Sequence, residues 1–312
     1  MVKERDLQRC SNGQWSIVRN HPIMSWNETS VAESLAVMVQ KETTVYNKRY
    51  DYLGNPSCAQ GVVSEDDRMK MVDWCYKVVD TCQLERETVA IAMDVVDRFL
   101  SNKSSTAAMD VLGDRIQFQL LSLTALYVSI KVSQKISLGS DFFSVISHEL
   151  YPIQDIEAME LVLLKELAWC ISPPTCVQVA NHVFSLLSTH VTLDRATWAA
   201  ILDEVEYQGE NAVRDYYFVT QRPSTVAMAA IFNATMDRLD NKEECQDIIR
   251  AVLSVMNSAE FESIEVILAA RTKLHNLVYG FDYDGDGGDA DDTADNDEDG
   301  CDSGEAQVDD AA

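Results

Sequence analysis

Apolar residues recur three and four positions apart along most of the chain, and this spacing predicts amphipathic helices. A first helix is expected from Ser30 to about Glu42, because Ser30 and Glu33 match a capping box ahead of the first apolar positions. After a loop near 54–64, two more helices are expected. Their apolar stripes consist of Met71, Cys75, Val78 and Cys82 in one helix, and of Val89, Ala92, Met93, Val96, Phe99 and Leu100 in the next.

The segment 115–131 is apolar on nearly every side, which in a globular protein predicts a central helix surrounded by others. A short helix is expected near 141–148. Pro152 then opens another helix, since proline is tolerated in the first turn, where its missing N–H has no partner. The apolar stripe of this last helix is Ile156, Met159, Leu163, Leu164 and Leu167.

From Thr175 a similar pattern begins again, with a third member, STVAMAAIFNATM, made of small and apolar residues. These helices are expected near 175–187, 195–208, 223–239, 243–256 and 260–278. No useful run alternates with period two, so almost no strand is expected. The prediction is an all-α protein with two tandem five-helix units, whose segments are an irregular N-terminus (1–29), a first unit with an N-terminal helix (30–172), a second unit (173–280) and a disordered acidic tail (281–312).

Charge is concentrated in the tail. The formal net charge is −26, and residues 281–312 hold fourteen acidic groups and no Lys or Arg, which leaves −12 on the rest of the chain. An acidic body repels a phosphate backbone, so direct nucleic-acid binding is not expected.

The tail contains the DxDxDG opening of an EF-hand calcium loop twice, beginning at Asp282 and Asp295. The twelfth position of such a loop is normally Glu, but here it is Thr293 or Ala306. We therefore interpret the tail as a solvated acidic run without a specific metal site.

Other chemical signatures are absent. The eight cysteines include no CxxC pair and no His at zinc spacing, and no GxGxxG, GxxxxGK, HExxH or GxSxG occurs. No apolar signal core or uninterrupted membrane span is present. The prediction is a non-enzymatic, intracellular protein that binds no cofactor, metal or membrane.

Asp97 raises a question of its own, because it borders the buried stripe of the predicted helix that ends near Leu100. An unpaired carboxylate there costs several kcal/mol. Arg68 is the natural partner, since a guanidinium binds a carboxylate bidentately. A structural buried ion pair between Arg68 and Asp97 is expected.

Four stretches around this pair resemble the N-terminal box of the cyclins. The resemblance covers residues 31–175 and is weaker over 176–280, where DYYFVTQRPSTVAMAA is similar to the third helix of a second cyclin fold. It implies two cyclin folds, with the Arg68 and Asp97 pair as an internal clamp. The four stretches are RMKMVDWCYKVV, VVDRFLS, ALYVSIK and AMELVLLKELAWCISPPT.

Members of this family bind a protein kinase through a Lys at the end of the third helix of the box and a Glu on the fifth. Lys131 and Glu160 hold those positions in this sequence. Glu160 also borders the apolar stripe of its own helix and does not lie on the solvated face. The alternative is a solvent-exposed pair of no consequence. An acidic pair that usually follows the interface lysine is replaced by Ser133 and Gln134.

Many cyclins also carry a docking patch for short basic and apolar substrate motifs, and Met71, Trp74 and Gln119 match it. Lys77 stands where an acidic residue would meet the arginine of the motif, and this charge reversal disfavours a basic ligand. The apolar members are also replaced by Asp67 and Lys70. A core or rim role is therefore preferred for Trp74.

The resemblance implies a regulatory subunit that binds and activates a cyclin-dependent protein kinase in cell-cycle control, in the nucleus or cytoplasm. Kinase substrates or inhibitors are further expected partners. The alternative is a cyclin-fold scaffold that acts in transcription or protein interaction without a kinase. The segment leading to RYDYLG is similar to D-type cyclins and to divergent diatom cyclins.

Overall fold

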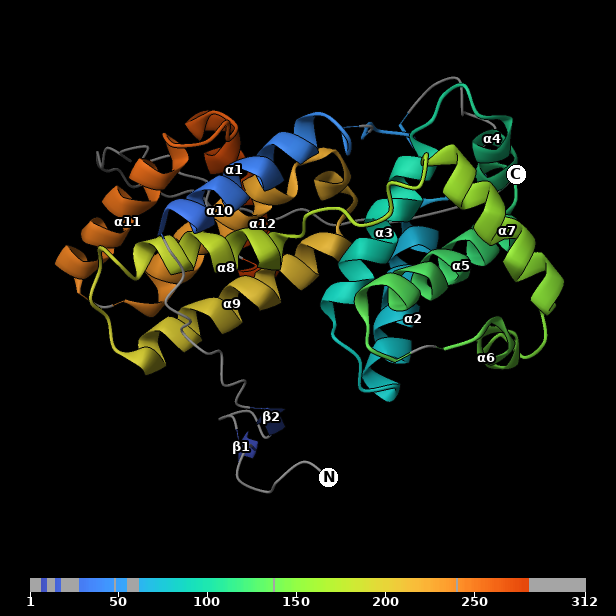
Figure 1. The fold of residues 1–312 in the computed structure, drawn as a ribbon, viewed down its shortest axis with the longest axis horizontal. Coiled ribbons are helices and arrows are strands. Elements are labelled where there is room, and N and C mark those ends of the chain that lie inside the picture. The colour runs from blue at the N-terminus through green and yellow to red at the C-terminus, as the bar shows by residue number, and fades with distance from the viewer. Residues whose placement is uncertain are drawn as a thin grey trace, which may run out of the picture. The chain divides into compact units, whose positions relative to one another are not determined.

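The computed structural model consists of helices joined by short loops, with one small two-stranded sheet near the N-terminus (Figure 1). It describes residues 7–9, 15–17, 28–47, 49–54, 62–136, 138–239 and 241–280. The predicted acidic tail and its DxDxDG pairs lie outside the described residues. Buried apolar side chains form two clusters within one compact unit.

The first bundle surrounds α5 (Arg115–Ser133), which lies against α3 and α7 in Figure 1. Every residue of α5 from 120 to 130 is buried, as expected for a central helix. By length and composition α5 is also apolar enough to cross a membrane, but 67% of its apolar window is buried inside the bundle. The other members are α2 (Glu65–Thr81), α3 (Glu87–Leu100), α4 (Thr106–Leu112), α6 (Ser140–Ile146) and α7 (Ile153–Glu166).

The second bundle surrounds α10 (Pro223–Arg238), whose residues 224–235 are all buried. Small side chains in this helix allow the neighbouring helices to approach closely, which explains its composition. The other members are α8 (Cys176–Leu187), α9 (Arg195–Arg214), α11 (Lys242–Met256) and α12 (Ile264–Tyr279), and the 3₁₀ helix η2 (Tyr216–Thr220) joins α9 to α10. The predicted all-α class with two tandem helical units is confirmed.

The N-terminal segment differs from its prediction as an irregular stretch. Two strands, β1 (Leu7–Arg9) and β2 (Trp15–Ile17), pair antiparallel with Leu7 opposite Ile17. Three residues per strand are too few to produce a period-two signal in the sequence.

Helix α1 (Glu28–Thr43) corrects two further expectations. It begins at Glu28, so Ser30 lies inside the helix and is not its cap. Its buried residues Val31, Leu35 and Val39 join the second cluster, where α1 packs on α8, although the sequence analysis groups this helix with the first unit. Periodicity identifies which face of a helix is buried but does not identify the helix that covers it.

Two smaller differences concern element limits. Helix α4 was not predicted, because seven residues carry too little periodicity. Helix α9 continues to Arg214, whereas its predicted end was near 208. The proposed domain limits at 30–172 and 173–280 stay predictions.

Candidate functional site

Lys131 and Glu160 come together on the surface of the first bundle. Lys131 lies in the last turn of α5 and Glu160 in the middle of α7, and Nζ of the lysine is 2.7 Å from Oε1 of the glutamate. The lysine side chain is 39% exposed and the glutamate 16%. The pair is therefore half-buried and does not lie on a fully solvated face.

A residue that the sequence analysis missed, Tyr127, supports this pair. Its hydroxyl oxygen accepts a hydrogen bond from Lys131 Nζ at 3.2 Å, and Nζ lies 4.6 Å from the centroid of its ring. Burial acts to lower the pKa of Lys131, but the hydrogen bonds and charge of Glu160 and Tyr127 outweigh it and raise that pKa above its ordinary value. The signal in the sequence was the spacing of four residues between Tyr127 and Lys131 on one helix face.

Large apolar side chains are exposed on the two helices that carry the pair and just after their ends. Val132 and Leu161 directly follow its two members, and Trp169, after the end of α7, is 68% exposed. Exposed apolar side chains of this size are a feature of protein-binding surfaces. The other exposed apolar side chains of this region are Val132 (51% exposed), Ile136 (54%) and Leu161 (52%).

The two residues that replace an acidic pair, Ser133 and Gln134, make hydrogen bonds inside the bundle. Gln134 Nε2 donates to Thr88 Oγ1 at 2.7 Å, and Ser133 Oγ donates to the carbonyl of Ser129 at 2.7 Å. They join the end of α5 to the start of α3. Positions 133 and 134 therefore carry no charge.

Arg68 and Asp97 form a bidentate ion pair in the interior. Arg68 Nε donates to Oδ1 of Asp97 at 2.9 Å, and Nη2 donates to Oδ2 at 2.7 Å. Both residues are at most 5% exposed. Burial acts to lower the pKa of Arg68, but the charge and hydrogen bonds of Asp97 raise it instead, so the guanidinium stays protonated.

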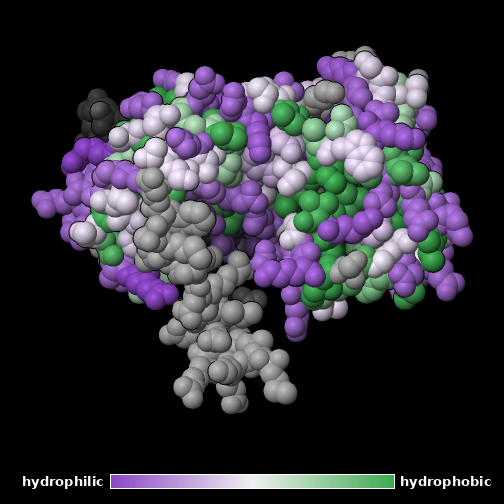
Figure 2. Space-filling view, viewed as in Figure 1, coloured by the Kyte–Doolittle hydropathy of each residue, from purple (hydrophilic) through white to green (hydrophobic). Residues whose placement is uncertain are grey.

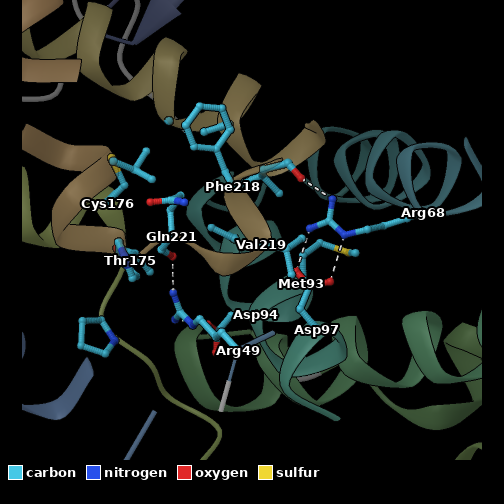
Figure 3. A pocket seen from close by; sticks show the side chains of 17 residues that line it. Arg49, Arg68, Met93, Asp94, Asp97, Thr175, Cys176, Phe218, Val219 and Gln221 are labelled. Atoms are coloured by element: carbon cyan, nitrogen blue, oxygen red, sulfur yellow. Dashed lines mark hydrogen bonds and ion pairs between the residues drawn. The ribbon is translucent and has the colours of Figure 1, made fainter. Parts of the chain in front are cut away.

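The same pair joins three segments of the chain. Tyr52, from the loop before α2, donates its hydroxyl to Asp97 Oδ1 at 2.8 Å, and Arg68 Nη1 donates to the carbonyl of Val213 in α9 at 2.8 Å. Figure 3 shows Arg68 between Asp97 and this backbone. The pair thus connects the loop between α1 and α2, the first bundle and the second bundle.

A second arginine makes a parallel connection that the sequence analysis missed. Arg49 pairs with Asp94 of α3, and its Nη1 donates to the carbonyl of Gln221 at 2.9 Å, which a dashed line marks in Figure 3. Asp94 also accepts from Arg98 at 2.6 Å. Both connections line a cavity of about 90 Å³ between the bundles.

The residues matched to a substrate-docking patch lie partly on the surface. Met71 and Trp74 are half-buried against the first core, and Gln119 is exposed, with its Oε1 accepting from the hydroxyl of Tyr151 at 3.1 Å. Lys77 is exposed. Lys70 pairs with Asp66, and Arg115 pairs with Asp67 at 3.0 Å. The charges at positions 67 and 70 are therefore paired within this chain.

Glu42 is a buried carboxylate that the sequence analysis missed. It lies near the end of α1 at 3% exposure and accepts from the backbone N–H of Ser224 at 2.9 Å and from its hydroxyl, in the first turn of α10. Burial raises the pKa of Glu42 to about 7, against the opposing effect of these hydrogen bonds and of Arg49. The spacing of Val31, Leu35, Val39 and Glu42 placed it on the buried face.

Metal chemistry finds no support in the described ranges. No group of three or more His, Cys, Asp or Glu side chains there is placed to hold an ion. Burial raises the pKa of the Cys75 and Cys176 thiols to about 12, so neither is a thiolate at neutral pH.

Comparison with known proteins shows what the part of the chain that holds Lys131, Glu160, Arg68 and Asp97 is similar to. A family model described as the N-terminal domain of cyclins matches residues 33–172. The chain is 26% identical over 127 residues to G1/S-specific cyclin-E of Caenorhabditis elegans, which covers 41% of this chain and 23% of the relative. It is 27% identical over 171 residues to G2/mitotic-specific cyclin-A1 of the same organism, a match that covers 55% of this chain and 32% of the relative. A match to G2/mitotic-specific cyclin-B3 of Gallus gallus is 26% identical over 230 residues, and it covers 70% of this chain and 53% of the relative.

Solved structures share the fold. A viral cyclin from herpesvirus saimiri superposes with a TM-score of 0.51 at 11% identity, covering 80% of this chain and 99% of that one. A chain of the CAK complex from Chaetomium thermophilum gives 0.50 at 14%, covering 81% and 76%. The length of these matches supports the tandem arrangement of two helical folds.

The chain spans only between 23% and 39% of the length of the first three curated relatives. The relatives named above are of the A, B and E types. The D-type or diatom-type subtype stays a prediction.

Proposed function

We propose that the chain belongs to the cyclin family and that it is the regulatory subunit that binds and activates a cyclin-dependent protein kinase in cell-cycle control. The names of the relatives, which include cyclins of the G1/S and G2/mitotic types, support the process. The CAK complex, in which one chain shares this fold, supports a kinase as the partner. In this proposal the chain performs no chemistry itself.

The observation that carries the proposal is the ion pair between Lys131 and the largely buried Glu160, on two helices that also bear exposed apolar side chains. The resemblance assigns the kinase contact to these two positions, and exposed apolar side chains favour a protein partner. In the space-filling view the broadest apolar area also lies over the first bundle, beside α3 and α5 (Figure 2).

Activation follows from differential binding. A kinase needs its lysine to glutamate ion pair formed and its activation loop displaced. A subunit that binds this active state more tightly by about 5.5 kcal/mol shifts a 1:99 population to 99:1. The connections through Arg49 and Arg68 favour a rigid platform, since less binding energy is then lost in ordering the surface.

The first test is a pull-down from cell extract with the wild-type chain and the Glu160→Ala variant, followed by a protein-kinase assay on a histone substrate. Glu160→Ala is expected to weaken kinase binding by about 2 to 5 kcal/mol, because it leaves Lys131 unpaired in the complex. Asp155→Ala is the matched control, since this exposed carboxylate lies on the same helix roughly 140° around from Glu160. Kinase recovered by the wild type and the control, and lost with Glu160→Ala, is the expected result.

Absence of any kinase with the wild-type chain, across synchronised extracts, contradicts the proposal and favours the scaffold alternative. Equal recovery with Glu160→Ala removes this pair from the interface but leaves the kinase partner in place. Residence in the nucleus or cytoplasm is part of the proposal, and fluorescence microscopy of a tagged chain tests it.

A further inference from the structure

Tyr127 lies directly beneath the ammonium group of Lys131. It is only 7% exposed, and its ring packs on the fully buried Phe143 with centroids 5.4 Å apart. Phe142 packs edge-on against Phe143 at 5.4 Å. The tyrosine ring is therefore held by the core of the first bundle, while its hydroxyl reaches the surface pair.

Two fixed groups therefore hold one flexible side chain. A long, flexible lysine side chain loses rotamer entropy when it is immobilised. Here Glu160 Oε1 at 2.7 Å and the Tyr127 hydroxyl at 3.2 Å already hold Nζ in the chain by itself. An ammonium has three donors, so the third stays available to a partner.

We propose that Tyr127 is a positioning residue of the kinase-binding surface, which holds the Lys131 ammonium against Glu160 in the geometry that meets the partner. The inference rests on the proposed function. Tyr127 acts through Lys131 and does not itself need to touch the kinase. Its effect is to reduce the entropy lost when Lys131 is ordered in the complex.

A purely structural role makes a different prediction. If the tyrosine only fills space, Tyr127→Phe changes nothing at Lys131, because the ring and its contact with Phe143 remain. If it positions the lysine, removal of the hydroxyl acts only when the lysine is present. A double-mutant cycle with Lys131→Ala separates the two roles.

The experiment is a calorimetric titration with a recombinant cyclin-dependent kinase subunit, the one that the wild-type chain recovers in the pull-down. Tyr127→Phe is expected to weaken binding about 3- to 10-fold, the effect of one net hydrogen bond. In the Lys131→Ala background the same change is expected to have no effect. Tyr217→Phe is the matched control, because this tyrosine also has a lysine over its ring, Lys273 at 5.8 Å, but lies on η2.

A second measurement needs no kinase. In the wild-type chain the ammonium protons of Lys131 are expected to exchange slowly with water in NMR spectra, and Tyr127→Phe is expected to accelerate that exchange. The melting temperatures of the two chains are expected to agree, since the ring packing is kept.

The outcomes separate this inference from the proposed function. The positioning role is overturned if Tyr127→Phe leaves kinase binding unchanged, or if it weakens binding equally in the wild-type and Lys131→Ala backgrounds. The proposed function stands in either case. Equal ammonium exchange in both chains overturns it as well. Absence of kinase binding by the wild-type chain removes the proposed function and this inference together.

Discussion

At the scale of single residues, Arg68 shows how much depends on one buried charge. It satisfies both oxygens of Asp97 and one backbone carbonyl, and all of these groups lose water in the folded state. Arg68→Ala is expected to destabilise the chain by about 3 to 5 kcal/mol, because Asp97 is left buried and unpaired. Urea denaturation measures this change.

The control for this prediction is Arg115→Ala. Arg115 also pairs with an aspartate, but its side chain is 57% exposed, and a surface pair contributes at most about 1 kcal/mol. Equal unfolding midpoints for Arg68→Ala and wild type would show that the interior pair makes no net contribution.

Glu42 predicts a dependence of stability on pH. Its folded pKa of about 7 lies above the ordinary value of 4.5, so the folded chain binds the proton more tightly. The stability that this protonation contributes is fully present below about pH 4.5 and is lost as pH rises through about 7. Glu42→Gln cannot titrate, so the stability of the wild type relative to this variant is expected to fall between pH 5 and 8. Thermal melts across that range test this, and parallel profiles for the two chains contradict it.

Single residues also show what a sequence pattern can and cannot identify. The Arg68 and Asp97 partnership was predictable because a carboxylate on a buried stripe needs a cation and a guanidinium can bind it bidentately. Arg49 gave no such signal, since its partners Asp94 and Gln221 are brought to it by the packing of two bundles.

At the scale of elements, two serines test where helices begin. Ser64 caps α2, because its hydroxyl accepts from the backbone N–H of Asp67 at 3.2 Å and the Asp67 carboxylate accepts from the backbone N–H of Ser64 at 3.0 Å. Ser64→Ala is expected to cost about 1 kcal/mol of stability. Ser30→Ala is expected to cost nothing or to stabilise slightly, because Ser30 lies inside α1, where alanine is the better helix former. A loss at Ser30 as large as that at Ser64, in chemical denaturation, would contradict these assignments.

Both serines precede an acidic residue three positions later, so the local pattern alone did not separate them. The elements with strong periodicity were predicted well, including the central helices α5 and α10. The placement of α1 was not predicted correctly, because its apolar face fits either bundle. Which bundle it joins depends on the geometry of α8 and α10.

At the scale of the whole molecule, the two bundles are joined largely by arginines. Besides Arg68 and Arg49, Arg86 of the loop before α3 pairs with Glu210 of α9 at 2.7 Å, and Arg214 pairs with Asp73 of α2 at 2.9 Å. The ring of Tyr76 lies between Arg86 and Arg214, at 4.4 and 4.5 Å. Polar connections of this kind fix an orientation, because each has a specific geometry that apolar contacts lack.

Arg49→Ala is expected to loosen this junction and to cost about 1 to 3 kcal/mol, since a buried carbonyl and Asp94 each lose a donor. Hydrogen exchange is expected to accelerate around η2 and the start of α10 while α5 stays protected. Arg250→Ala is the control, because its side chain is 72% exposed in an i,i+3 pair. Unchanged exchange at η2 in Arg49→Ala would show that this arginine does not hold the junction.

The helical class, the two central helices and the buried clamp partners were predictable from the sequence, and the family resemblance supplied the two residues proposed to meet a kinase. The first three depend on spacing along one chain segment or on the cost of burying a charge, and both can be evaluated without coordinates. Three features became visible only in the packed chain: the bundle that receives α1, the carbonyls that the arginines reach, and the position of Tyr127 under Lys131. These depend on how packed helices cross, and a one-dimensional periodicity carries no information about the partner of the face that it defines.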